Sequence, residues 1–152
     1  MSQPHVFELG TDGPKVIVVG IDGSESSFRA AAYAAGLARR QRSKLAIVYI
    51  RPLAASMSAA AAAELVTVRD AIADDLRAQI EAAARQLPEG SFADWDFHVG
   101  EGDPFRGLVD FATRLKADAV VIGASQQAGH RIVGSVAVRL VKAGKWPVTV
   151  VP

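Results

Sequence analysis

Three short apolar runs, each next to segments with helical periodicity, place the strongest constraint on the fold of this chain. The runs cover residues 15–21, 45–50 and 118–122, and the sequences KVIVVGI, LAIVYI and DAVVI are dominated by aliphatic side chains. A strand that is apolar on both faces is typical of a parallel sheet with helices on both sides. The runs therefore predict an α/β fold.

Helical periodicity fills the segments between the strands. The first predicted helix begins near Asp22 or Ser24, which are both good N-caps, and ends in a cationic turn. Further helices are predicted from about Ser58 to Gln86, after the N-cap Asp103, and from the N-cap Ser135 to about Lys142. The long second helix has an apolar face at Leu65, Val68, Ile72, Leu76, Ile80, Ala83 and Leu87.

Two further strands complete the pattern. Residues 93–100 (ADWDFHVG) alternate between apolar and polar side chains, which predicts a strand with one wet face at a sheet edge. Residues 148–151 form a short β-branched run that predicts a last strand. The order of elements predicts one domain at residues 15–152, an open, twisted, mostly parallel five-stranded sheet with right-handed crossovers and helices on both faces. Residues 1–14 are expected to form a flexible lead.

Composition limits the classes of function. The chain has 152 residues with 17 basic and 16 acidic side chains, so its net charge of +1 offers no general attraction for nucleic acid. It has no cysteine, which excludes thiolate catalysis, disulfides and cysteine-based metal sites. No apolar run approaches the roughly 18 residues that span a bilayer, and the N-terminus lacks the pattern of a secretory signal. We therefore expect a cytoplasmic protein without a membrane partner.

A candidate ligand site follows from the ends of the first and fourth strands. In doubly wound folds, ligands bind beyond the carboxyl ends of the strands, where the strand order reverses. Asp22 follows the first strand, Gly123 the fourth, and Gly134-Ser135 opens the last helix. A carboxylate can accept hydrogen bonds from sugar hydroxyls, while a glycine-bearing loop and a helix N-terminus can hold phosphate. Two alternatives stay open: an ordinary strand-to-helix connection at the loop, and a plain helix cap at Asp22.

Signatures of catalysis are missing from the sequence. No Gly-Lys-Ser/Thr follows the glycines, as a Walker A loop requires, and no Gly-x-Ser-x-Gly elbow occurs. Asp94, Asp96 and His98 share a strand face on which a metal could bind, but the wet face of an edge strand explains them more simply. The pair His130-Arg131 either adds positive charge to a bound phosphate or forms a solvated loop tip. We therefore expect a binding protein rather than an enzyme.

Five segments taken together resemble the universal stress protein family. They are VVGIDGS at 18–24, GDP at 102–104, ADAVVIG at 117–123, GSV at 134–136 and WPVTVV at 146–151. The resemblance implies a Rossmann-like fold of the adenine-nucleotide alpha-hydrolase type and a homodimer that pairs through residues 148–151. It also implies that an adenine nucleotide (ATP, AMP or cyclic AMP) is bound without strong catalytic activity. On the sequence evidence, no metal is expected to be required.

The resemblance also assigns roles to residues of the candidate site. Asp22 would face the ribose, and the backbone around Ile21 and Ile50 would flank the adenine. Gly123 would lie under the ribose and phosphates, and the phosphates would be held by Gly134, Ser135, Val136 and Ala137. The predicted nucleotide site also includes four residues of the loop before this helix: Ser125, Gly129, His130 and Arg131.

The loop departs from the nucleotide-binding pattern of the family in two places. That pattern is Gly, two residues, Gly, nine residues, and then Gly-Ser or Gly-Thr, whereas here Gln126 replaces the second glycine and only seven residues separate it from Gly134. A shorter loop without that glycine spans less of a phosphate chain, which favours AMP or cyclic AMP over ATP. Two functions remain: a nucleotide-binding stress-response regulator acting as a homodimer, and a dimeric interaction protein of the same fold that has lost nucleotide binding.

Overall fold

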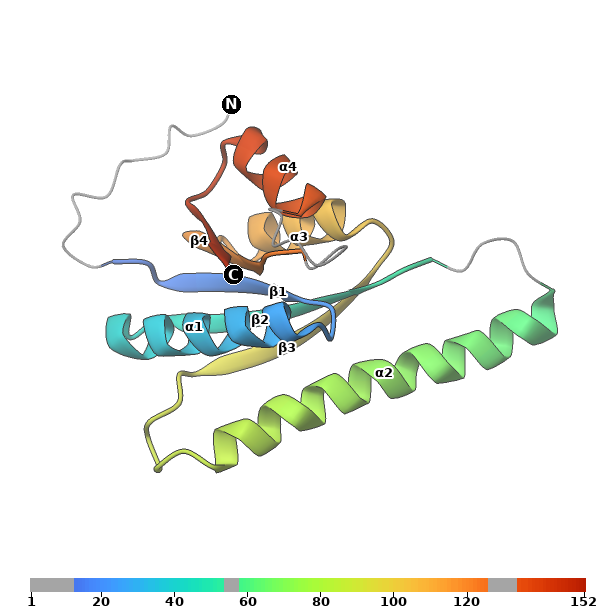
Figure 1. Cartoon of the computed structure of the whole chain (residues 1–152), viewed down its shortest axis with the longest axis horizontal. Coiled ribbons are helices and arrows are strands. Elements are labelled where there is room, and N and C mark those ends of the chain that lie inside the picture. The colour runs from blue at the N-terminus through green and yellow to red at the C-terminus, as the bar shows by residue number, and fades with distance from the viewer. Residues whose placement is uncertain (1–12, 54–57, 126–133) are drawn as a thin grey trace.

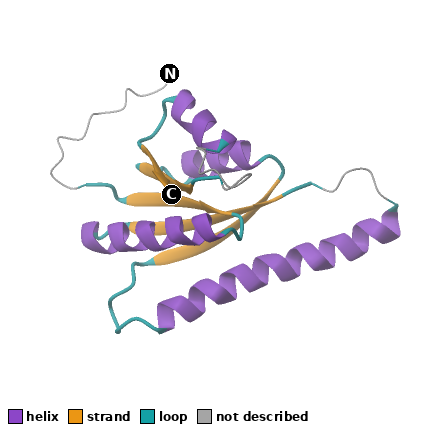
Figure 2. Ribbon diagram, viewed as in Figure 1, coloured by secondary structure: helices purple, strands orange, loops and turns teal. Residues whose placement is uncertain are grey.

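A computed structural model of the chain describes residues 13–53, 58–125 and 134–152 (Figure 1). Strands and helices alternate along these residues, as Figure 2 shows. All of the predicted elements are present close to their predicted bounds, while residues 1–12 of the predicted lead lie outside the described residues. The elements are β1 (Val16–Ile21), α1 (Glu25–Gln41), β2 (Lys44–Arg51), α2 (Ala59–Arg85), β3 (Trp95–Glu101), α3 (Pro104–Arg114), β4 (Ala119–Gly123), α4 (Ser135–Ala143) and β5 (Val148–Val151).

The strands form one parallel sheet in the order β3-β2-β1-β4-β5. The chain winds from the central strand β1 to β3 at one edge, and then crosses back so that β4 pairs with the other side of β1. This confirms the predicted α/β fold and makes β1 and β4 the pair at which the strand order reverses. The last strand is also parallel to its neighbour, with Val148 opposite Val120 and Val151 opposite Gly123.

Alternating side chains of the strands build a separate hydrophobic core on each face of the sheet. On β1, Ile17 and Val19 belong to the core formed with α1 and α2, while Val18 belongs to the core formed with α3 and α4. All three side chains are fully buried. Because the central strands are covered on both faces, every position along them has to be apolar, which explains the continuous runs in the sequence.

The first residues of the helices are fixed by short polar contacts. Ser24 is the N-cap of α1, and its hydroxyl accepts a hydrogen bond from the Ser27 backbone N–H at 3.2 Å. Asp103 caps α3 in the same way, because its carboxylate accepts from the Arg106 N–H at 3.0 Å. The prediction of Ser135 as the N-cap of α4 is wrong: Gly134 is the cap, and Ser135 is the first helical residue.

The long helix α2 is docked through fewer apolar residues than its sequence predicts. Leu76 and Ile80 are buried at 4% and 6% exposure, but Val68 and Ile72 are 55% and 44% exposed. The remaining buried positions on this side of the helix include Arg69, whose guanidinium pairs with Glu101 at 2.5 Å. The apolar stripe of α2 is therefore only partly covered by the sheet.

The predicted edge position of β3 is confirmed by the strand order. On its polar face, the Asp96 carboxylate pairs with the Lys44 ammonium at 2.7 Å, and this contact lowers the pKa of Asp96 and raises that of Lys44. Within residues 13–53, 58–125 and 134–152, no group of three His, Asp or Glu side chains is arranged to hold a metal. Over the same residues, no helix has the length and apolarity that crossing a bilayer requires.

Candidate functional site

A cavity of about 230 Å³ opens at the carboxyl ends of β1 and β4, where the strand order reverses. Its walls come from the ends of β1, β2 and β4 and from the first turns of α1, α3 and α4. The structure thus brings together nine of the residues predicted for the site: Ile21, Asp22, Ile50, Gly123, Ser125, Gly134, Ser135, Val136 and Ala137. The other three, Gly129, His130 and Arg131, lie outside the described residues, as does Gln126.

Asp22 shapes the turn that leads from β1 into α1. Its carboxylate oxygen Oδ1 accepts a hydrogen bond from the Ser24 backbone N–H at 2.9 Å, and its own N–H donates to Ser27 Oγ at 3.3 Å. Because Ser24 is the N-cap, Asp22 does not cap the helix itself. The side chain is exposed at the mouth of the cavity, so Oδ2 remains available to accept hydrogen bonds from a ligand.

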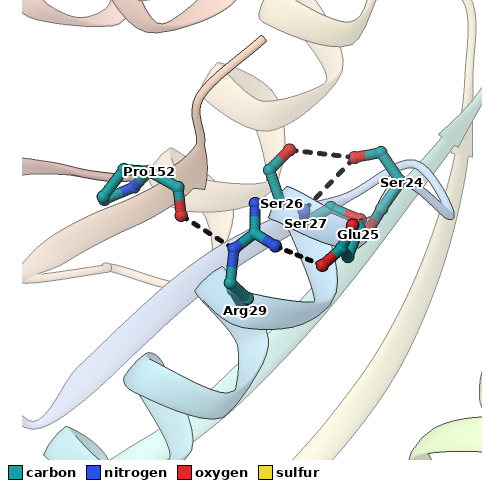
Figure 3. Close-up of polar contacts among 6 residues, drawn as sticks. All are labelled: Ser24, Glu25, Ser26, Ser27, Arg29 and Pro152. Carbon is teal, nitrogen blue, oxygen red and sulfur yellow. Dashed lines mark hydrogen bonds and ion pairs between the residues drawn. The ribbon is translucent and has the colours of Figure 1, made fainter. Parts of the chain in front are cut away.

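Three serines at the start of α1 form a polar wall that the sequence reasoning missed. Ser26 and Ser27 are 3% and 4% exposed, and both line the cavity together with Ser24. Figure 3 shows the Ser24 hydroxyl in contact with two partners, Ser26 Oγ at 3.2 Å and the Ser27 backbone N–H at 3.2 Å. The signal in the sequence was the repeated serine directly after Asp22-Gly23, which we used only to predict the helix start.

A basic residue holds this helix start against the last strand. Arg29 Nε donates to the Pro152 carbonyl at 2.8 Å, and the same guanidinium pairs with Glu25 at 2.6 Å (Figure 3). Pro152 follows β5, which pairs with β4. Arg29 does not line the cavity, so its contribution is to position α1 relative to the strands that do.

The N-terminus of α4 lines the cavity, and its first N–H groups make no hydrogen bonds within the helix. No side chain in the described part of the chain caps it, and the hydrogen bond from Val138 N–H to the Gly134 carbonyl closes its first turn at 3.1 Å. The N–H groups of Ser135, Val136 and Ala137 precede that bond and have no acceptor within the helix. Together with the positive end of the helix dipole, they form an anion-binding arrangement.

Gly123 is required by close packing between β4 and α1. A Cβ atom at this position would lie 2.7 Å from the carbonyl carbon and oxygen of Ser26 and 2.8 Å from the Ser27 nitrogen. Neither backbone group can move aside as a flexible side chain could, so only glycine fits here. The packing also brings the end of β4 next to the polar wall of α1, which narrows the cavity at this side.

Apolar residues from the other face of the sheet form the opposite wall of the cavity. Ile50 is 7% exposed, and it is held in place because Gly100 and Gly107 leave room for its side chain. Leu108 of α3 lies against Gly20 of β1, where an added Cβ would meet its methyl at 3.0 Å. Gly20 and Leu108 line the cavity but were not predicted, because their patterns in the sequence indicated only a strand and a helix.

The N-cap of α3 is tied to the second turn of α4 beside the cavity. The Arg139 guanidinium lies 3.2 Å from the Asp103 carboxylate and stacks over the Phe105 ring at 4.2 Å. The pKa of Asp103 is lowered first by the hydrogen bond from the Arg106 N–H and then by the contact with Arg139. This ionised carboxylate thereby links α4 to α3 near the α4 N-terminus, through a pair that is largely exposed.

The fold and the site define a class of α/β protein in which a cavity at the strand-order reversal combines a carboxylate, an apolar wall and a helix N-terminus without a side-chain cap among the described residues. The family model described as the universal stress protein family matches residues 14–152, and the chain belongs to that family. Universal stress protein MJ0531 of Methanocaldococcus jannaschii is 26% identical over 152 residues, which cover 96% of this chain and 86% of that protein.

Two solved structures show the same fold. Universal stress protein UspA from Lactobacillus plantarum superposes with a TM-score of 0.78 at 23% identity, covering 91% of this chain and 97% of that one. A universal stress protein crystallised in complex with cAMP has a TM-score of 0.59 at 28% identity, covering 91% of this chain and 97% of that one.

Proposed function

We propose that this chain binds an adenine nucleotide with a single phosphate, AMP or cyclic AMP, and acts as a regulatory protein rather than an enzyme. One observation carries the proposal: the uncapped N-terminus of α4 and the carboxylate of Asp22 line the same cavity at the strand-order reversal. An anion-binding group and a sugar-binding group within one small cavity match the two polar parts of a nucleoside monophosphate. The cAMP complex of a 28% identical relative supports the same ligand class.

The chemistry of the walls sets the orientation of the nucleotide. The start of α1 already has a side-chain cap, because the Ser24 hydroxyl accepts from the Ser27 N–H, and it lies beside the Asp22 carboxylate, which repels phosphate. The start of α4 has neither feature, so the phosphate belongs there. The ribose hydroxyls then face Asp22, and the base lies against the apolar wall that includes Ile21 and Ile50.

The lining also favours one phosphate over three. Asp22 is the only charged side chain among the described residues that line the cavity, so no described cation offsets the charge of a triphosphate. The N–H groups at the start of one helix suffice for about one phosphate. The shortened loop with Gln126 also favours one phosphate, since a longer phosphate chain needs more inward-facing N–H groups.

Calorimetric titration with adenosine, AMP, cyclic AMP and ATP tests this proposal. We expect AMP or cyclic AMP to bind more tightly than adenosine, and ATP to bind less than ten-fold more tightly than AMP. A ten-fold advantage for ATP corresponds to about 1.4 kcal/mol and would show that the site handles further phosphates. Absence of binding by all four ligands would contradict the proposal altogether.

A dimeric interaction protein without a nucleotide is the second candidate, and the edge strand β5 favours it. This strand is last in the sheet order, and Val148, Thr149, Val150 and Val151 are each only half-buried. A short β-branched edge strand offers its unpaired N–H and carbonyl groups to a second copy across a two-fold axis. If the titrations show no binding while the dimer persists, this second function replaces the first.

A further inference from the structure

The hydroxyls of the three serines at the start of α1 differ in how far their hydrogen-bonding capacity is used. Ser27 Oγ donates to the Ser24 carbonyl at 2.8 Å and accepts from the Asp22 N–H at 3.3 Å. The Ser24 hydroxyl accepts from the Ser27 N–H at 3.2 Å and contacts Ser26 Oγ at 3.2 Å. Within the described part of the chain, this contact is the only hydrogen bond of the Ser26 hydroxyl. Ser27 is therefore fully used within the turn, whereas the pair of Ser24 and Ser26 has capacity left for a ligand.

A count of protons shows what this pair can offer. Each hydroxyl carries one proton, and the contact between Ser24 and Ser26 uses only one of the two. The Ser27 N–H can only donate, so Ser24 Oγ acts as its acceptor. Hydrogen bonds in a chain strengthen one another when each hydroxyl accepts one bond and donates the next, which makes Ser24 the donor to Ser26. The Ser26 O–H is then the donor that has no acceptor among the described residues.

The position of Ser26 makes this donor available to a ligand. Ser26 is 3% exposed and lines the cavity, and a donor so well shielded from solvent is costly to leave without an acceptor. Its backbone packs against the end of β4, since a Cβ atom on Gly123 would lie 2.7 Å from the Ser26 carbonyl. Ser26 therefore lies where the first turn of α1 meets β4, at the reversal of the strand order.

An acceptor is held next to this donor by the same residue. The Asp22 carboxylate accepts from the Ser24 N–H at 2.9 Å through Oδ1, which leaves Oδ2 for a ligand. Asp22 and Ser26 are thus both hydrogen-bonded to Ser24, one to its backbone and one to its side chain. A carbonyl or ether oxygen only accepts and an ammonium only donates, but a hydroxyl does both. An acceptor beside a donor therefore complements a hydroxyl group of a ligand.

We propose that Ser26 is a specificity-determining residue that donates a hydrogen bond to a ribose hydroxyl, whose own proton goes to Asp22. This inference rests on the nucleotide-binding function proposed above, and it adds that the ligand is a ribonucleotide. A ligand without that hydroxyl leaves the Ser26 donor without an acceptor and the Asp22 carboxylate without a donor. A site built to bind a hydroxyl discriminates strongly against such an analogue.

Calorimetric titration with AMP, 2′-deoxy-AMP and 3′-deoxy-AMP tests the role of Ser26. We expect the unchanged protein to prefer AMP to at least one of the two deoxy analogues by about ten-fold or more. In Ser26→Ala this preference should fall by about three- to ten-fold, the range that loss of one hydrogen bond gives. The variant keeps the Ser24 cap, and urea denaturation confirms that it is folded.

Two further variants separate hydrogen bonding from shape. Ser26→Cys keeps the approximate size of the side chain but is a weak donor, so it should lose the preference as Ser26→Ala does. Ser91→Ala removes the same hydroxyl from a residue outside the cavity lining and should keep the full preference.

An equal preference for AMP in Ser26→Ala and in the unchanged protein would overturn the role of Ser26 while leaving the proposed function in place. No preference for AMP over either deoxy analogue in the unchanged protein would do the same. A further titration with adenosine identifies the group that Ser26 contacts. If Ser26→Ala weakens binding of AMP but not of adenosine, Ser26 contacts the phosphate, and the inference is wrong. If the unchanged protein binds none of these ligands, the proposed function fails and this inference fails with it.

Discussion

Replacing Asp22 separates its role in the α1 turn from a role in ligand binding. In Asp22→Ala, the Ser24 N–H loses its acceptor at 2.9 Å. Because this contact is exposed and resembles a cap, the free energy of unfolding should fall by about 1 kcal/mol. If Oδ2 also accepts from the ribose, the nucleotide affinity should fall by a further 1.5–3 kcal/mol, the approximate range for hydrogen bonds to charged groups. That loss is roughly ten- to a hundred-fold in the dissociation constant.

Two further variants make the assay specific. Asp22→Asn keeps an oxygen for the Ser24 N–H but loses the charge, so we expect nearly unchanged stability together with weaker nucleotide binding. Ser58→Ala removes the cap of α2, where Ser58 Oγ accepts from the Ala61 N–H at 3.3 Å away from the cavity, and should lower stability without changing affinity. Urea denaturation and calorimetric titration give the two quantities. Reduced stability with unchanged affinity in Asp22→Ala would refute a role for this carboxylate in ligand binding.

Three other predictions address packing, ionisation and assembly. Gly123→Ala should lower the free energy of unfolding by about 1–3 kcal/mol in urea denaturation, because its Cβ would lie 2.7 Å from the Ser26 backbone. The control Gly36→Ala, whose Cβ would have its nearest neighbour at 3.8 Å, should not lower the free energy of unfolding. The hydrogen bond from the Arg106 N–H holds the pKa of Asp103 below its ordinary value of 3.8, so the stabilising contribution of Asp103 is present above that pH and is lost as the pH falls through the lowered value. Asp103→Asn should therefore lose less stability than the unchanged protein between pH 5 and pH 2, as measured by thermal melting. Light scattering at micromolar concentration should give a dimer with twice the 16.0 kDa mass of one chain. Removal of residues 146–152 should abolish this dimer. A monomeric full-length protein would contradict pairing through β5.

The fold was predictable because its main constraint is local. The central strands are buried on both faces, so β1, β2 and β4 appear in the sequence as unbroken apolar runs, and the glycines and prolines that end each element are visible as well. The edge position of β3 was predicted from its alternation and is confirmed, but the prediction of one wet face is wrong in part. His98 of the predicted wet face is half-buried against the Phe111 ring at 5.5 Å, and Val99 of the predicted apolar face is 38% exposed.

The walls of the site were harder to predict because they depend on contacts between distant elements. Leu108 lines the cavity only because α3 packs on β1. Its apolar spacing in the sequence predicts a buried helix position and does not indicate that it lines a cavity. Ser135 looked like an N-cap, but the cap depends on backbone angles that place Gly134 there instead. The covered part of α2 was overestimated, since helical periodicity shows which side chains share a face and not how far a sheet extends beneath them.

The most direct test of the account follows the backbone amides at the start of α4 by NMR. Addition of AMP should shift the signals of Ser135, Val136 and Ala137, because their N–H groups face the cavity and lack acceptors within the helix. Adenosine, which has no phosphate, should leave these three signals nearly unchanged while it shifts Ile21 and Ile50. Equal shifts at α4 with both ligands, or shifts by AMP elsewhere only, would contradict a phosphate site at this helix.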